Sequence, residues 1–363
     1  MTKSTTHKTH TVKPKLTSQQ INDFQQELDA LRQSIEAKMG QEDIDHIQSV
    51  IEMQRYLEVS GRLLIHFSLE PVSWALGVAS LSAAHILENM EIGHNVIHGQ
   101  FDFMGDPHLN GKRYEWDILG TSNNWRQTHN FKHHTYTNIQ GFDDDIGYDI
   151  IRVFPEQKWS PWFLLQPIYS LLFAFVFEWG VALQNVNFKV KKGRSLRKQL
   201  KEQNPEAWQK MKHQLLKDYV VFPLLAGPMI LPVFLGNVVA NVIRSLWTFV
   251  IIFCGHFTEK TVVFAPEEAQ KTSNGDWYLR QIRSSSNIKG GFLFHVLSGN
   301  LSHQIEHHLF PEIPANRYRE LAPAVKDICV KYGQTYNTGR LSSQFFQVVT
   351  RIVKYSLPIG RTA

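Results

Sequence analysis

The most constraining feature of this chain is a set of three histidine clusters that lie far apart in the sequence. The chain has 17 histidines among 363 residues. Eight of them form the clusters: His94 and His98; His129, His133 and His134; and His303, His307 and His308. Composition alone predicts about 0.04 copies of the pattern H-x-x-x-H-H, whereas the chain contains two. Chance is therefore a poor explanation of the clusters.

The spacing within each cluster indicates metal binding. Residues four apart on a helix lie on one face with their side chains close together. Neutral imidazole is the commonest nitrogen ligand of transition metals in proteins. A single histidine is more often a surface or hydrogen-bonded core residue, but that interpretation does not account for eight histidines grouped in this way. The clusters predict a metal centre, and the fold must bring three distant segments together to build it.

Long apolar runs indicate an all-α integral membrane protein. They cover residues 63–87, 162–183, 219–235 and 238–257. A helix needs about 20 apolar residues to cross the hydrocarbon core of a bilayer, and the first, third and fourth runs reach or approach that length. Tryptophans lie in or beside the runs, as expected of an interfacial aromatic belt.

The positions of the clusters restrict the topology. All three must lie on one side of the membrane to share a metal site, so an even number of crossings must separate His134 from His303. The run at 162–183 precedes a basic stretch, residues 189–198, that should stay in the cytoplasm, so we expect this run not to cross. Residues 219–235 and 238–257 would then form a hairpin that returns His256 to the cytoplasmic face. Arg244, inside the second arm, should face protein rather than lipid.

The chain has no linker or repeat that would divide it into several domains. We expect a basic, partly disordered N-terminal tail at 1–45, a membrane domain at 46–325 with a cytoplasmic helical cap rich in histidine, and a C-terminal tail at 326–363. Pro71 splits the first apolar run, so a tight hairpin or a single crossing before His94 are both open.

Charge and cysteine content narrow the partners. The net charge of +5 suits a surface that faces anionic membrane lipid. The basic residues are not interleaved with a stacking motif, so nucleic acid is not expected as a partner. Cys254 and Cys329 are the two cysteines, too few for a disulfide framework or an iron–sulfur cluster.

The number of histidines bears on the chemistry. A zinc hydrolase needs three or four ligands, whereas the clusters together with His256 are enough for two metals. A pair of irons with histidine ligands is suited to activating dioxygen. The membrane setting adds a lipid substrate, whose long chain would lie in an apolar tunnel.

At these motifs the chain resembles the membrane fatty acid desaturases, a family with three histidine boxes. Residues 304–311, with the sequence QIEHHLFP, are similar to the third box of acyl-lipid and acyl-CoA desaturases. Residues 89–94, 141–147 and 255–259 resemble the bacterial stearoyl-CoA desaturases of the mycobacterial type. The similarity covers roughly residues 63–318.

The resemblance implies a di-iron enzyme that uses O2 and two electrons to place a cis double bond in a long-chain acyl-CoA or acyl-lipid, with position 9 expected. It implies a bacterial inner-membrane location with the active site facing the cytoplasm. The implied iron ligands are His94, His98, His129, His133, His134, His256, His303, His307 and His308.

Gln304 stands where many desaturases have a histidine, so Gln304 or His303 could coordinate, and the shared spacing favours His303. Gln304, Glu306 and Asp144 are expected beside the ligands, where carboxylates such as Asp143 and Asp145 would orient imidazoles.

No haem module with a His-Pro-Gly-Gly signature is found in the sequence, so electrons are expected from a separate protein. The resemblance implies a ferredoxin-type or flavin reductase donor, which the basic surface around Lys191 and Lys192 could dock.

Three alternatives stay open from the residues alone. His303, Glu306 and His307 match H-x-x-E-H, the inverted zinc-protease motif, although this leaves the first two clusters unexplained. A di-iron lipid hydroxylase shares the first hydrogen abstraction with a desaturase. A membrane scaffold without catalysis is the third.

Overall fold

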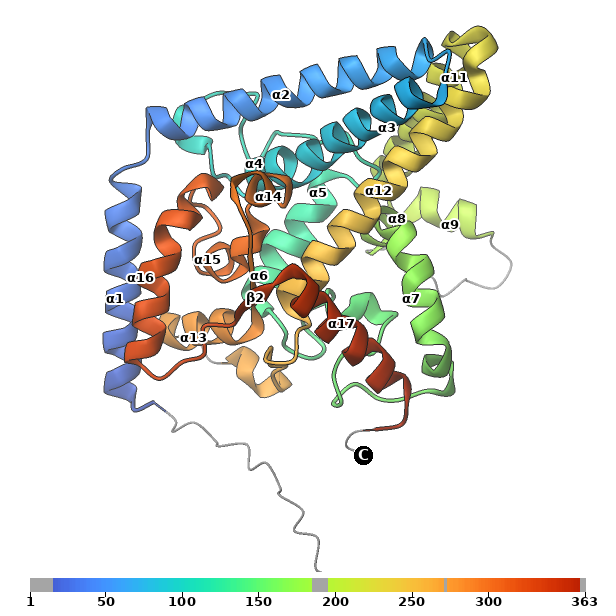
Figure 1. The fold of residues 1–363 in the computed structure, drawn as a ribbon. Helices are drawn as coiled ribbons and strands as arrows, with labels where there is room; N and C mark the ends of the chain where they lie inside the picture. The colour runs from blue at the N-terminus through green and yellow to red at the C-terminus, as the bar shows by residue number, and fades with distance from the viewer. Residues whose placement is uncertain (1–15, 185–194, 271–272, 360–363) are drawn as a thin grey trace, which may run out of the picture.

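The computed structural model describes residues 16–184, 195–270 and 273–359 (Figure 1). Helices make up nearly all of its regular structure. Two three-residue strands, β1 (Asn287–Lys289) and β2 (Thr338–Arg340), pair in parallel, with Asn287 opposite Thr338. The prediction of an essentially helical protein is therefore confirmed.

Helices α2 (Gln41–His66) and α3 (Pro71–Ile86) form a hairpin whose turn lies just before Pro71. The Glu70 carboxylate accepts hydrogen bonds from the backbone N–H groups of Val72 and Ser73 and so caps α3. The two helices cross at glycines: a Cβ atom at Gly77 would lie 2.8 Å from the Ile65 side chain. The hairpin leads α3 directly into the segment that carries His94.

Helix α12 (Ile230–His256) runs through the molecule and ends at the predicted ligand His256 (Figure 1). Among the described residues, the segment Gly227–His256 is the one continuous helical stretch long and apolar enough to cross a membrane. The chain turns at residue 226, between α11 (Phe222–Leu225) and the short helical segment Gly227–Met229 that leads into α12. The predicted boundary near residue 236 is therefore wrong, because residues 230–235 belong to α12.

The run at 162–183 does not form one straight helix. It contains α7 (Gln166–Phe175) and α8 (Phe177–Leu183), and the axis bends by 87° between the helical stretches Pro161–Phe175 and Phe177–Leu183. Glu178 of α8 pairs with Arg244 of α12. Arg244 is 4% exposed, so the prediction that it faces protein is confirmed.

Helices also occupy parts of both predicted tails. Helix α1 (Ser18–Glu36) buries Phe24 and Leu28 in a cluster with residues of α13 (Asn274–Ser284) and α16 (Tyr318–Lys331). Near the C-terminus, α17 (Leu341–Ser356) buries Val348 and Ile352 in the cluster that contains Phe249 of α12. Residues 1–15 of the predicted N-terminal tail lie outside the described residues, as does most of the basic stretch at 189–198 with Lys191 and Lys192. The domain boundaries stay a prediction.

Candidate metal centre

Four separate helical segments bring the predicted ligands together. His94 ends the π-helical segment Leu87–His94, and His98 follows α4 (Asn95–Ile97). A second π-helical segment, Arg126–His133, supplies His129 and His133 and leads into α6 (His134–Tyr136). Helix α12 supplies His256, and α15 (Gln304–Leu309) supplies His307 and His308. Stretches of π-helix inside α-helices are frequent at functional sites.

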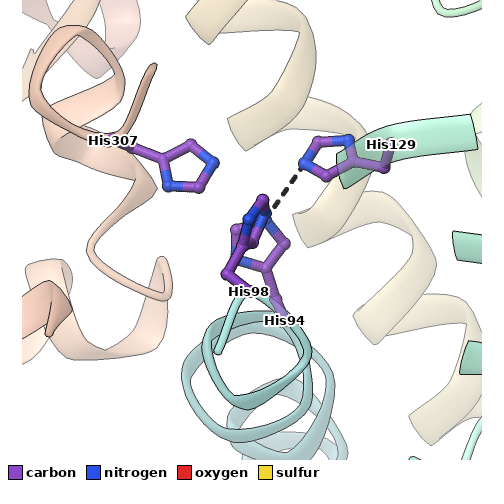
Figure 2. Close-up of side chains that lie close together, drawn as sticks. All are labelled: His94, His98, His129 and His307. Atoms are coloured by element: carbon purple, nitrogen blue, oxygen red, sulfur yellow. Dashed lines mark hydrogen bonds between the residues drawn. The ribbon is translucent and has the colours of Figure 1, made fainter. Parts of the chain in front are cut away.

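These side chains converge in four overlapping groups whose candidate ligand atoms lie within 4.8 Å of one another. Figure 2 shows one of them, in which the imidazoles of His94, His98, His129 and His307 face a common centre. The other groups are His133, His256 and His308; His134, His307 and His308; and His129, His133 and Asp145. Eight of the nine predicted histidine ligands are thus brought together.

The ring nitrogens of the cluster have the chemistry expected of metal ligands. His98 Nε2, His307 Nε2 and both ring nitrogens of His134 are buried without a hydrogen-bond partner. A buried polar atom left in this way costs free energy, which a bound metal ion would offset. The Nε2 atoms of His94 and His129 are 3.3 Å apart, and those of His256 and His308 are 3.2 Å apart. At these distances one neutral imidazole can donate its N–H to the other, and the same two nitrogens lie close enough together to coordinate one ion.

Electrostatics keeps most of these imidazoles in the form that binds metal. Burial lowers the pKa of His98, His129 and His307 well below its ordinary value, so they are neutral at physiological pH. His133 differs. Burial works to lower its pKa, but the carboxylates of Asp143 and Asp145 prevail and raise it to about 9. The same two carboxylates would attract a cation bound next to His133.

Outer contacts orient the rings. Nδ1 of His133 lies 3.1 Å from both carboxylate oxygens of Asp143. Nδ1 of His308 lies 3.0 Å from Oε1 of Gln281, and Nδ1 of His307 lies 3.3 Å from the hydroxyl of Tyr318. Partners of this kind fix which ring nitrogen faces the metal. Gln281 and Tyr318 were missed in the sequence, because they lie outside the histidine clusters and no local pattern marks them.

Two predicted supporting residues lie elsewhere. Asp144 forms an ion pair with Lys132 at 2.8 Å and is partly exposed. The Glu306 carboxylate is buried but accepts hydrogen bonds from Asn287 and Tyr336. No hydrogen bond or ion pair is described between either residue and an imidazole of the four groups. The carboxylates positioned to orient imidazoles are those of the two neighbours of Asp144 in the sequence, Asp143 and Asp145.

The structure separates His303 from the cluster and places Gln304 in it. His303 stacks on His295 with ring centroids 4.6 Å apart and belongs to none of the four groups. Helix α15 begins at Gln304, and His303 has non-helical torsion angles, so the four-residue spacing to His307 does not place both on one helical face. Gln304 Nε2 lies 2.9 Å from His256 Nε2, and Gln304 Oε1 is buried without a partner. Position thus favours Gln304 over His303, contrary to the preference drawn from spacing.

The absence of a side chain at Gly255 provides the space that Gln304 occupies. A Cβ atom at Gly255 would lie 3.1 Å from three side-chain atoms of Gln304, tighter than ordinary van der Waals contact. The glycine before His256 therefore lets the Gln304 side chain reach the histidines.

An apolar cavity adjoins the cluster. Four of the clustered histidines line it together with Met90, Trp125, Tyr148, Phe177 and Ile252. A metal centre at the wall of a narrow apolar cavity suits oxidation of an unactivated hydrocarbon chain, because the cavity binds the chain and excludes water.

A family model of fatty acid desaturases matches residues 72–340. The chain belongs to the fatty acid desaturase family. Over 348 residues, this desaturase is 43% identical to the NADPH-dependent stearoyl-CoA 9-desaturase of Mycobacterium tuberculosis, covering 94% of this chain and 82% of that protein. It is 31% identical over 272 residues to the sn-1 linoleoyl-lipid 6-desaturase of Synechocystis sp., covering 72% and 74% of the two chains.

Family membership makes the desaturase an oxidoreductase of lipid metabolism, and the family is membrane-associated. A zinc peptidase or a scaffold does not fit this membership. The position of His303, outside the four histidine groups, also argues against the inverted peptidase motif.

Proposed function

We propose that this desaturase uses a pair of irons, O2 and two electrons to introduce a cis double bond at position 9 of a long-chain acyl-CoA. The observation that carries the proposal is the convergence of eight histidines, seven of them buried and His98 partly exposed, beside an apolar cavity that four of them line. The name of the Mycobacterium tuberculosis relative supports the acyl-CoA substrate and position 9. The balanced reaction consumes the acyl chain, O2, two electrons and two protons, and yields the unsaturated chain and two waters.

The histidines of the four groups would hold the two irons, and Gln304 is the ninth candidate ligand. The irons would supply the activation of O2 that removal of hydrogen from a saturated chain requires. The remaining contributions come from the protein. Asp143, Gln281 and Tyr318 orient the rings of His133, His308 and His307, and the apolar lining holds the acyl chain beside them and excludes water.

We infer that electrons come from a separate NADPH-linked reductase of the ferredoxin or flavin type, in line with the NADPH dependence named for the Mycobacterium tuberculosis relative. We also infer insertion in the bacterial inner membrane with the histidines at the cytoplasmic face. The apolar α12 ends at His256, so a membrane crossing by this helix would deliver His256 to one membrane surface.

A product assay tests the proposal. The detergent-purified protein would be supplied with NADPH, a reductase system and stearoyl-CoA, and the acyl products would be identified by mass spectrometry. The expected product is the cis-9 unsaturated acyl chain, formed only with O2 and reductant. A hydroxylated chain would favour the hydroxylase alternative, and product from phospholipid but not acyl-CoA would move the substrate to acyl-lipid.

A further inference from the structure

Apart from the histidines and Asp145, the wall of the apolar cavity contains an arginine–glutamate ion pair. Glu178 of α8 and Arg244 of α12 both line the cavity and form a salt bridge. Their side chains are 10% and 5% exposed. The carboxylate is held in place on its other side, because Glu178 Oε1 accepts a hydrogen bond of 2.8 Å from the backbone N–H of Leu119.

The ion pair lies at the end of the cavity that is remote from the histidines. The α12 residues that line the cavity are Arg244, Ser245, Thr248, Ile252 and His256, which share one face of the helix. The twelve residue steps from Arg244 to His256 correspond to about 18 Å along the axis. The cavity therefore follows α12, with predicted metal ligands at one end and the charges at the other.

A second cavity with a different lining begins at the ion pair. Glu178 and Arg244 line it as well, and its other residues include His85, Asp117, Lys217 and Asn241. The Arg244–Glu178 pair is thus shared by an apolar cavity and a polar one.

We propose that the Arg244–Glu178 pair stops the methyl end of the acyl chain and sets the longest chain that the desaturase accepts. This inference rests on the proposed acyl substrate. A longer chain would have to separate the pair and leave buried charges without partners, which is strongly unfavourable. Beyond the pair, the polar lining offers the extra methylene groups little apolar surface to bury.

The test is a competition between stearoyl-CoA and arachidoyl-CoA, which is two methylene groups longer. The double variant Arg244→Ala, Glu178→Ala removes both charges together, so that neither is left unpaired, and it opens the wall. We expect the ratio of arachidoyl to stearoyl product to rise about tenfold over wild type, the factor that burial of two more methylene groups predicts. Asn241→Ala is the matched control, since Asn241 lies on the same helix and lines only the polar cavity. It should leave the ratio unchanged.

A second variant acts in the opposite direction. Val181 lies one turn after Glu178 and lines the apolar cavity, so Val181→Phe should shorten the cavity and raise the ratio of palmitoyl to stearoyl product. If the double variant loses its iron or has a much lower melting temperature, the ratio of palmitoyl to stearoyl product formed by Val181→Phe becomes the test of the end stop. Wild-type ratios in every folded variant would overturn the end stop while leaving desaturation intact. A wild-type protein that forms no product from any acyl-CoA would overturn the proposed function, and the end stop with it.

Discussion

Both carboxylate oxygens of Asp143 lie 3.1 Å from Nδ1 of His133, while the next residue, Asp144, lies at the surface in an ion pair with Lys132. Asp143 also accepts a hydrogen bond from the backbone N–H of Asn138 at 2.7 Å. The carboxylate is therefore held by the chain that follows α6, and it holds the imidazole in turn. With Nδ1 engaged by Asp143, Nε2 is the ring nitrogen of His133 left for the group with His256 and His308.

Asp143→Asn should weaken iron binding and activity by about 10–100-fold, the usual effect of removing such a partner from a ligand histidine. The amide keeps the size of the side chain but loses the charge that favours the imidazole orientation. Iron per chain and the rate of product formation are the measurements. Asp144→Asn is the matched control and should behave as wild type. Equal losses in both variants would contradict the assignment.

His307→Ala should abolish product and reduce bound iron, because His307 belongs to two of the four ligand groups. The wild-type protein should contain about two irons per chain if the set binds a pair. His303→Ala should retain iron, since its ring stacks on His295 outside the groups. Plasma mass spectrometry of the purified variants measures this directly. Iron lost from His303→Ala and kept in Gln304→Ala would restore His303 as the ligand.

Gly299→Ala should destabilise the protein more than Gly333→Ala. Both glycines have positive φ, +66° and +64°, so an alanine costs about 1–3 kcal/mol of strain at each position. At Gly299 the new Cβ would also collide with the backbone carbonyl of Met90, whereas nothing lies within 4 Å at Gly333. Met90 belongs to the segment that ends at His94, so Gly299→Ala should lower both the melting temperature and the iron content. Equal melting temperatures for the two variants would refute this.

Glu306→Gln should change the pH dependence of stability. Burial raises the pKa of Glu306 from 4.5 to about 7, against the hydrogen bonds from Tyr336 and Asn287, which lower it. The folded protein thus holds this proton more tightly than the unfolded chain. The resulting stabilisation is complete below about pH 4.5 and is lost as the pH rises through 7, a change of about 3 kcal/mol over this window.

The melting temperature of Glu306→Gln should therefore improve relative to wild type as the pH rises from 5 to 8, since glutamine has no proton to lose. Glu320→Gln, at an exposed ion pair with Lys38, is the control and should show no such trend. A difference between Glu306→Gln and wild type that does not vary with pH would show that this carboxyl is not protonated in the folded state.

The grouping of eight of the nine predicted histidines could be anticipated from the sequence, because it depends largely on local spacing. Spacings such as His94 to His98 and His129 to His133 fall on one helical face wherever the helices lie, and the need for a common metal required the clusters to meet. The apolar run that became α12 and the protein-facing Arg244 could also be predicted, since the hydrophobic length and the cost of a charge in lipid act on short segments.

Only the tertiary structure decided the rest. A short turn before α15 moves His303 away and leaves Gln304 beside His256, and a spacing rule that assumes a continuous helix cannot anticipate such a turn. Tyr318, Gln281 and Glu178 reach the centre or its cavity from segments outside the histidine clusters. Ligand types and their local spacing were thus determined by the sequence alone. Which side chains support them, and where the cavity ends, depended on packing between segments whose relative positions exist only in the folded chain.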